Sequence, residues 1–176
     1  QFSAGLRSSA SVRGHEQCNT SICRLCHFSF DSKSYNLGRM PNVAIFVDGD
    51  NVPSKDTQNI LSEAGSFGRI VNAMVFGDWS TPQMKPWKDS ASQHGLLTMQ
   101  CDLLKGKNST DIRMMIEIMR LLYTSEVVDI YVIVTSDSDY RHVVSEIKMR
   151  GKRCYCIGSV NTNNSLQNIC DKFVKL

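Results

Sequence analysis

Residues 129–150, DIYVIVTSDSDYRHVVSEIKMR, contain the pattern that decides the fold. An apolar run ends in a polar turn with two aspartates, and a segment with apolar residues three and four apart follows. Continuous apolar runs are typical of strands buried on both faces of a parallel sheet. The stretch therefore predicts a strand–turn–helix unit. It also raises the question of whether Asp137 and Asp139 only cap the helix or belong to a site.

The same alternation runs through the chain from residue 43 onward. The expected strands cover residues 43–48, 69–76, 96–101, 129–134 and 153–158. The expected helices cover residues 54–65, 82–94, 111–124, 140–150 and 164–176. Such strand–helix units predict an α/β fold of the Rossmannoid kind, with three α/β/α layers around a five-stranded, mostly parallel sheet.

Two helices carry further expectations. Gly65 is expected to close the helix at 54–65. The helix at 111–124 has clear 3.6-residue periodicity, which places Glu117 off its buried face. The residues expected on that buried face are Ile112, Met115, Ile116 and Met119.

Residues 1–41 differ from the rest of the chain. They are rich in Ser and Arg, lack periodicity, and suit a disordered leader or an organellar targeting segment. The net charge of +3 arises within residues 1–42, whereas residues 43–176 carry equal numbers of basic and acidic side chains. The predicted domain at 42–176 therefore has no bulk basic field, and any binding of nucleic acid must depend on local patches.

The seven cysteines do not indicate a disulfide framework. Cys23 and Cys26 have the spacing of a zinc-ligand pair, but no second pair stands at a usual distance, so structural zinc is not favoured. We expect a reducing intracellular location, either cytoplasmic or mitochondrial. No apolar run approaches the roughly 18–20 residues that cross a bilayer, so we expect no membrane partner.

Acidic residues follow the strands at the ends where ligands gather in such folds. The first strand ends in DGDN (48–51), the fourth is followed by TSDSD (135–139), and Asp111 begins the helix before the fourth strand. Each acid has a simpler explanation as a helix cap or turn residue. Together on one edge they would repel each other unless a cation held them, and Mg²⁺ prefers such oxygen ligands. We therefore expect a site for Mg²⁺ or Mn²⁺.

Five blocks of the chain resemble, in the same order, the NYN domain, a branch of the PIN-like nuclease superfamily. They are FVDGDNVPSK (46–55), VFGDWSTPQMKPWK (75–88), KGKNSTDIRMMIEIMRLLYT (105–124), VTSDSDYRHVV (134–144) and NICDKFVKL (168–176). The likeness is strongest to the bacterial-type form, which often precedes a LOTUS module. We expect such a module, if used, to be supplied elsewhere.

The resemblance implies adjacent first and fourth strands and a metal-dependent ribonuclease that hydrolyses RNA, which we expect to be single-stranded. The implied catalytic and metal-binding acids are Asp48, Asp111, Asp137 and Asp139, with Asn51 orienting a ligand or substrate; Asp50 is a less certain member. From their places in the sequence, we expect four residues to bind substrate: Lys105, Lys107, Asn108 and Ser136. A solvated basic loop is an equally good explanation of Lys105, Lys107 and Asn108.

Two other functions stay open. DGDNV (48–52) fits the D-x-D-x-[TV] pattern of haloacid-dehalogenase-type phosphatases, in which Asp48 would be the nucleophile and Asp50 the acid/base. A non-catalytic RNA-binding module is the third interpretation. The sequence also leaves a homo-oligomer open. Trp79 and Trp87 are candidate stacking surfaces for unpaired bases, although core packing is the simpler role.

Overall fold

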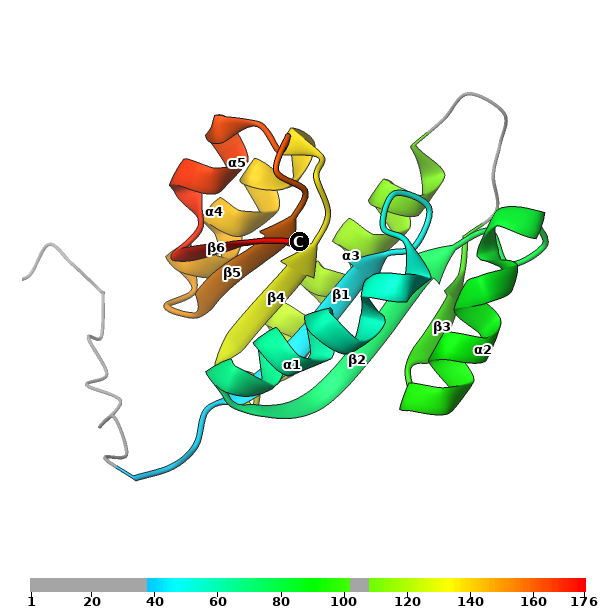
Figure 1. Ribbon diagram of the computed structural model, residues 1–176. Coiled ribbons are helices and arrows are strands. Elements are labelled where there is room, and N and C mark those ends of the chain that lie inside the picture. The colour runs from blue at the N-terminus through cyan, green and yellow to red at the C-terminus, as the bar shows by residue number, and fades with distance from the viewer. Residues whose placement is uncertain (1–37, 102–107) are drawn as a thin grey trace, which may run out of the picture. The chain divides into compact units, whose positions relative to one another are not determined.

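The computed structural model describes residues 38–101 and 108–176, and within them the chain forms a six-stranded, all-parallel sheet with five α-helices (Figure 1). The strands are β1 (Asn42–Asp48), β2 (Arg69–Gly77), β3 (Leu97–Gln100), β4 (Ile130–Val134), β5 (Arg153–Gly158) and β6 (Lys172–Lys175). The helices are α1 (Thr57–Phe67), α2 (Lys85–His94), α3 (Ser109–Thr124), α4 (Arg141–Met149) and α5 (Asn164–Ile169).

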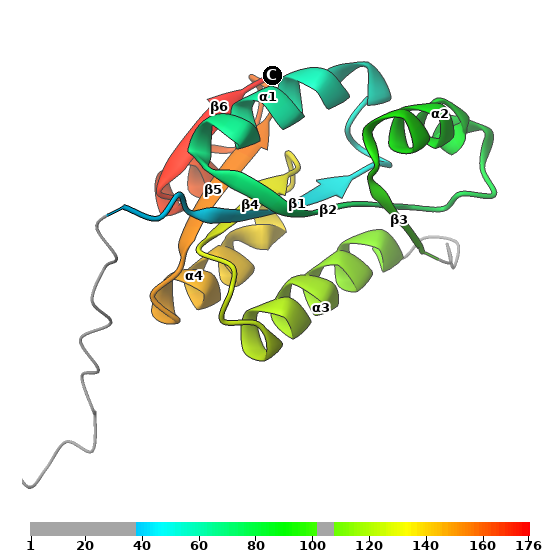
Figure 2. The same ribbon diagram turned by 90° about the horizontal axis from the view of Figure 1, so that it is seen from below.

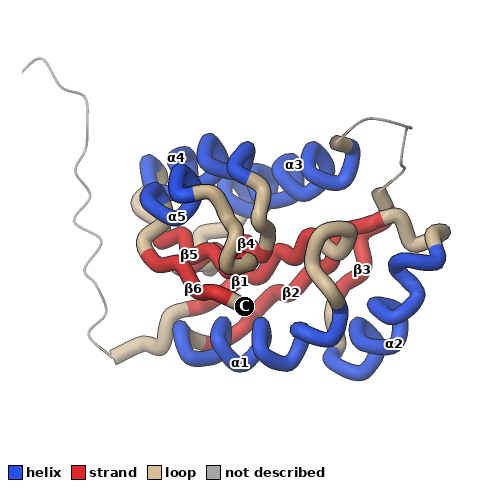
Figure 3. The backbone as a smooth tube through the Cα atoms, turned by 45° about the horizontal axis from the view of Figure 1, so that its top comes forward, coloured by secondary structure: helices blue, strands red, loops and turns tan. Residues whose placement is uncertain are grey.

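The strand order is β3-β2-β1-β4-β5-β6, so β1 and β4 are neighbours at the centre of the sheet. Helices α1 and α2 cover one face, and α3, α4 and α5 cover the other (Figure 3). Figure 2 shows the same separation, with α1 and α2 on one side of the strands and α3 and α4 on the other. The predicted three-layer α/β/α fold and the adjacency of the first and fourth strands are confirmed.

The central strands are buried on both faces, as their continuous apolar runs predict. Successive side chains of β1 enter opposite cores: Phe46 stacks on Tyr131 on the face of α3 and α4, whereas Ile45 packs into the core under α1 and α2. This double burial fixes the strand ends in place. The loops that carry the acids at the carboxyl edge therefore follow strands that are fully buried.

The prediction of one helix over 164–176 is wrong in its second half, and the sheet has six strands instead of five. Helix α5 ends at Ile169, after which the chain pairs with β5 as β6. Asp171 begins this pairing, because its backbone N–H donates to the Cys154 carbonyl at 2.9 Å and its carboxylate accepts from the Cys154 N–H at 2.9 Å. The open edge of β5 thus gives the backbone of residues 172–175 hydrogen-bond partners outside a helix.

The prediction of which residues form the buried face of α3 is also wrong. Ile112 and Ile116 are about half exposed, at 55% and 54%, while Met115 and Met119 are only partly buried against the core. The helix instead buries Thr110, Met114, Glu117, Ile118 and Leu122. Apolar residues occupy two faces of this helix, so periodicity alone could not choose between them.

Glu117 is buried in spite of its charge, and Arg120 pairs with its carboxylate one turn later along α3. This pair, with some contribution from Arg113, keeps the pKa of Glu117 below its ordinary value. The sequence expectation that Glu117 lies off the buried face is therefore wrong.

Helix α1 continues past Gly65 and ends before Gly68. A Cβ atom on Gly68 would lie 2.2 Å from the Pro41 carbonyl oxygen, which accepts from the Arg69 N–H at the start of β2. Close packing against the chain that enters β1 therefore requires glycine at 68. The expected end at Gly65 is wrong, because α1 runs through that position to Phe67.

Helix α2 ends as predicted, with Gly95 in the left-handed conformation at φ 68°.

No helix among the described residues has the length and apolar character needed to span a bilayer. Within the same part of the chain, the cysteines are free thiols: Cys101, Cys154, Cys156 and Cys170. Cys23 and Cys26 lie outside the described residues.

Candidate acidic site at the carboxyl edge of the sheet

The acids singled out in the sequence meet at the carboxyl edge of the sheet. Asp48 is the last residue of β1, and the loop carrying Asp137 and Asp139 directly follows β4. The chain passes from β1 to its neighbour β2 on one side, whereas β4 and the strands that follow it lie on the other side of β1. The carboxyl ends of β1 and β4 therefore flank the topological switch point of the sheet. Ligands of such folds bind at this position.

Asp48 is fully buried at the end of β1. Its Oδ2 accepts hydrogen bonds from Asn51 Nδ2 at 2.7 Å and from Thr135 Oγ1 at 3.1 Å. Among the described residues no group donates to its Oδ1, which is also buried. Burial raises the pKa of Asp48, and the charge of Asp50 raises it further, against the lowering effect of the hydrogen bonds.

Asp111 lies in the first turn of α3, but its side chain does not cap the helix. Its Oδ1 accepts from the Tyr140 hydroxyl at 3.1 Å. Burial, followed by neighbouring negative charges, raises the pKa of Asp111 to about 6; the charges belong to Asp48, Asp137 and Asp139. The structure therefore brings the four predicted acids close enough for their charges to interact.

Asp137 caps the short 3-10 turn Ser138–Tyr140 that precedes α4. Its Oδ1 accepts from the Asp139 backbone N–H at 2.8 Å, and its own N–H donates to Thr135 Oγ1 at 3.2 Å. Asp139 is exposed in the first turn. The capping explanation is thus confirmed for Asp137, and the capping bond fixes the orientation of its carboxylate.

Two further predicted residues form polar contacts on the same edge. Asp50 Oδ2 accepts from Thr110 Oγ1 at 2.6 Å, which ties the loop after β1 to the start of α3. Ser136 Oγ donates to Ser159 Oγ at 3.2 Å and accepts from the Ser159 N–H at 3.0 Å, which links the loops after β4 and β5. Neither contact tests a role in binding substrate.

Asn108 is exposed directly before α3, and its carbonyl accepts from the Ile112 N–H. Lys105 and Lys107 lie outside the described residues. Trp87 is a core residue, since it is 2% exposed and its indole N–H donates to the Val52 carbonyl. Core packing is therefore the correct explanation of Trp87, and the half-buried Trp79 packs against the same core cluster.

Three residues that hold the acids were not identified from the sequence: Thr110, Thr135 and Tyr140. Thr135 stands between a buried strand and two acids, which is a weak signal for a residue that supports a site. Tyr140 gave no signal, because it is 29 positions from Asp111 and only the folded chain brings them together. Its own pKa is raised, chiefly by burial and then by the charge of Asp111.

The acidic site is not a preformed metal-binding group, because no three Asp, Glu, His or Cys side chains of residues 38–101 and 108–176 converge on one point. Its chemistry nevertheless fits a hard divalent cation. Asp48 Oδ1 is a buried oxygen that lacks a donor, and both Asp48 and Asp111 have raised pKa values that a nearby cation would lower.

The all-parallel sheet, with acids gathered at its switch point, is consistent with a PIN-like α/β fold. A family model described as NYN domain matches residues 42–176. The chain therefore belongs to the NYN domain family, a PIN-like nuclease family, and the resemblance seen in the sequence is confirmed.

A solved structure of a protein of unknown function from Vibrio parahaemolyticus is similar to this chain, with a TM-score of 0.64 and 17% sequence identity. The similarity covers 79% of this chain and 94% of that protein. At this level of identity it supports the fold alone. No curated protein matches the chain.

Proposed function

We propose that this protein is a metal-dependent ribonuclease that hydrolyses phosphodiester bonds of single-stranded RNA. The observation that carries the proposal is the buried Asp48 carboxylate, whose Oδ1 has no hydrogen-bond donor among the described residues. The negative charge of Asp48 also raises the pKa of Asp111. Membership of a nuclease family supports the reaction class. Both features fit a cation site at the position where this fold binds ligands.

The cation would be Mg²⁺ or Mn²⁺. Asp48 and Asp137 would bind it directly, and Asp111 and Asp139 would bind it directly or through water. When bound, such an ion lowers the pKa of a coordinated water and stabilises the charge that develops at phosphorus. No nucleophile from the protein is needed.

The other residues of the edge would position these groups. Asn51 and Thr135 hold one oxygen of Asp48, which leaves Oδ1 for the ion, and Tyr140 fixes the rotation of Asp111. Substrate phosphates would be held on either side of the acids. The proposed contacts there are Ser136, Asn108, Lys105 and Lys107.

An assay with three substrates tests the proposal. The purified protein is incubated with single-stranded RNA, single-stranded DNA and a phosphomonoester, each with Mg²⁺, Mn²⁺ or EDTA. We expect RNA cleavage that is lost in EDTA and in Asp48→Asn, but is retained in Asp89→Asn, an exposed acid on α2. Metal-independent cleavage that Asp48→Asn leaves undiminished would overturn the mechanism.

The same assay separates the alternatives. Release of phosphate from the monoester alone, with a phospho-aspartate trapped at Asp48, would identify a phosphatase of the haloacid-dehalogenase type. Retention of RNA without cleavage under any metal condition would identify a non-catalytic binding module.

A further inference from the structure

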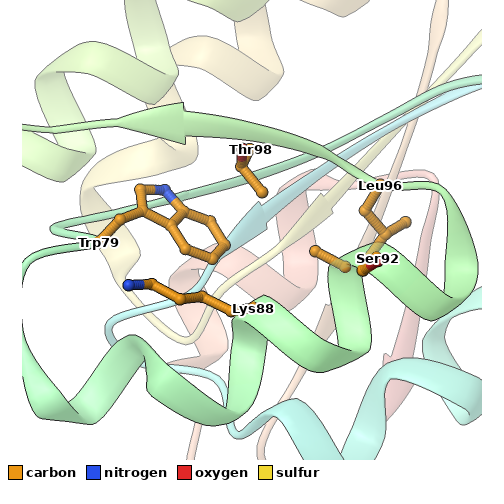
Figure 4. A pocket seen from close by; sticks show the side chains of 6 residues that line it. Trp79, Lys88, Ser92, Leu96 and Thr98 are labelled. Atoms are coloured by element: carbon orange, nitrogen blue, oxygen red, sulfur yellow. The ribbon is translucent and has the colours of Figure 1, made fainter.

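A pocket of about 420 Å³ lies between α2 and the edge strand β3 (Figure 4). Its volume is within the range of roughly 300–1,000 Å³ that small ligands occupy. Trp79 and Lys88 stand at one end, and Leu96 and Ser92 stand at the other. The full lining is Trp79, Lys88, Ala91, Ser92, Leu96 and Thr98. None of these residues belongs to the acidic site.

The indole of Trp79 is held in a fixed orientation. Its Nε1–H donates to the Met99 carbonyl at 3.0 Å, and its backbone N–H donates to Gln100 Oε1 at 3.2 Å. The ring is half-buried and borders the open volume of the pocket (Figure 4). A preoriented aromatic ring beside an open cavity is a stacking surface that loses little conformational entropy on binding.

Lys88 adds a positive charge to the same end of the pocket. Its side chain is exposed and extends from α2 beneath the indole (Figure 4). It has no acidic partner within ion-pair distance among residues 38–101 and 108–176. An aromatic ring next to an unpaired cation matches a nucleobase with its attached phosphate.

Trp79 follows the carboxyl end of β2, at the edge of the sheet that also carries the acidic site. Strand β2 ends at Gly77, where a Cβ atom would lie 3.1 Å from Asp50 Oδ1, and Trp79 follows two residues later. The pocket also borders β3, the outermost strand of the sheet on this side among the described residues.

We propose that this pocket binds one unpaired nucleobase of the RNA, stacked on Trp79, with a neighbouring phosphate near Lys88. The inference rests on the proposed function, because it assumes that RNA is the substrate. It adds a binding subsite formed by residues other than those of the acidic site. Stacking of one base on an aromatic side chain is expected to contribute roughly 5- to 100-fold in affinity.

The test combines removal of a base with removal of the ring. A series of short RNAs carries one abasic nucleotide at each position in turn. Their affinities are measured by fluorescence anisotropy for two proteins, Asp48→Asn and Asp48→Asn with Trp79→Leu. Asp48→Asn is used because we expect it not to cleave the RNA. We expect one abasic position to weaken binding about 5- to 100-fold when Trp79 is present and by less than about twofold when it is absent. Equal losses in both proteins would overturn the stacking assignment.

Lys88→Gln tests the pocket without any change to its packing. Loss of one phosphate contact should reduce the slope of log affinity against log salt by about 0.7. The matched control is Lys172→Gln, an exposed lysine at the start of β6 on the opposite edge of the sheet, which should leave the slope unchanged. An unchanged slope in Lys88→Gln would contradict the proposal.

The two proposals fail in different ways. If wild-type protein cleaves RNA while Trp79→Leu and Lys88→Gln bind it with wild-type affinity, only the pocket assignment is wrong. If wild-type protein neither binds nor cleaves RNA, the proposed function is wrong and the pocket assignment with it.

Discussion

At the scale of single residues, the acidic edge places carboxylates where their charged forms are disfavoured. Burial and mutual repulsion raise the pKa values of Asp48 and Asp111, with the latter reaching about 6. Unfavourable charges of this kind are common at functional sites, where a residue that serves binding or catalysis lowers the stability of the fold. Replacing such a residue should therefore stabilise the protein while it removes activity.

Asp111→Asn should stabilise the metal-free protein at neutral pH. In EDTA, the folded state of wild type binds the Asp111 proton more tightly than the unfolded state does, because the folded pKa is about 6 and the ordinary value is 3.8. The contribution of Asp111 to stability is therefore fully present below pH 3.8 and is lost as the pH rises through 6. Partial exposure reduces the effect, so we expect Asp111→Asn to gain about 1–2 kcal/mol at pH 7.5.

Urea unfolding in EDTA between pH 4 and 7.5 measures this gain. The difference between Asp111→Asn and wild type should be small near pH 4 and should grow through the window. Asp89→Asn, on the exposed side of α2, should track wild type at every pH. A constant difference across the whole range would mean that the effect of Asp111→Asn is packing and not charge.

Tyr140→Phe should weaken binding of Mn²⁺ about tenfold with little change in fold. Tyr140 donates to Asp111 Oδ1, and loss of a hydrogen bond that orients a metal ligand commonly costs about 10–100-fold in metal affinity. Isothermal titration with Mn²⁺ measures the effect without reference to catalysis.

Tyr131→Phe provides a matched control for that substitution. Tyr131 is also fully buried, but its hydroxyl has no hydrogen-bond partner among the described residues. Its replacement should leave Mn²⁺ affinity unchanged and should stabilise the fold by about 1 kcal/mol, since an unsatisfied buried group is removed. Equal losses of Mn²⁺ affinity in the two variants would show that Tyr140 acts only through packing.

At the scale of secondary-structure elements, two glycines near the end of α1 should respond in opposite directions to alanine. Gly65→Ala lies within the helix with no atom close by, so it should stabilise the protein by about 0.5–1 kcal/mol. Gly68→Ala would put a Cβ atom 2.2 Å from the Pro41 oxygen, and we expect a loss of about 2–3 kcal/mol. Thermal unfolding of the pair measures both; a stable Gly68→Ala would disprove the close packing at this position.

The elements that the sequence predicted best are those with only one plausible arrangement. A short, continuous apolar run rich in β-branched residues, such as IYVIV, is typical of a strand buried on both faces, and β4 covers that run. Helix α3 has apolar side chains on two faces, so the choice of Ile118 over Ile116 depended on the sheet beneath it. The change from α5 to β6 depended on the open edge of β5, which no local pattern encodes.

The candidate site divides in the same way. Acids at strand ends could be predicted, because parallel strands bring their carboxyl ends to one edge and the likeness of the sequence blocks identified which strands are neighbours. The donors to those acids could not. Thr135 and Tyr140 are ordinary residue types in ordinary contexts, and their roles come from distances of about 3 Å that only the packed chain defines.

At the scale of the whole molecule, the acidic edge joins structures on both faces of the sheet. Asp48 ends β1 at the centre of the sheet, Asp111 belongs to α3 on one face, and the loop after Asp48 leads to α1 on the other. A ligand that contacts Asp48, Asp111 and Asp137 would therefore link β1, α3 and the loop after β4. Binding there should stabilise the fold as a unit and not only the loop that carries each acid.

Mn²⁺ should accordingly raise the melting temperature of the protein. A ligand present at 100 times its dissociation constant stabilises the folded state by about 2.7 kcal/mol, which corresponds to roughly 5–10 °C for a domain of this size. In the presence of the ion, the repulsion that raises the pKa of Asp111 is also relieved, so the gain should be larger at pH 7.5 than at pH 5. Differential scanning calorimetry with Mn²⁺ or EDTA measures both effects. Asp48→Asn should abolish the shift, whereas Asp89→Asn should keep it; an equal shift in Asp48→Asn would place the ion elsewhere on the protein and remove the basis for a metal-dependent reaction at this edge.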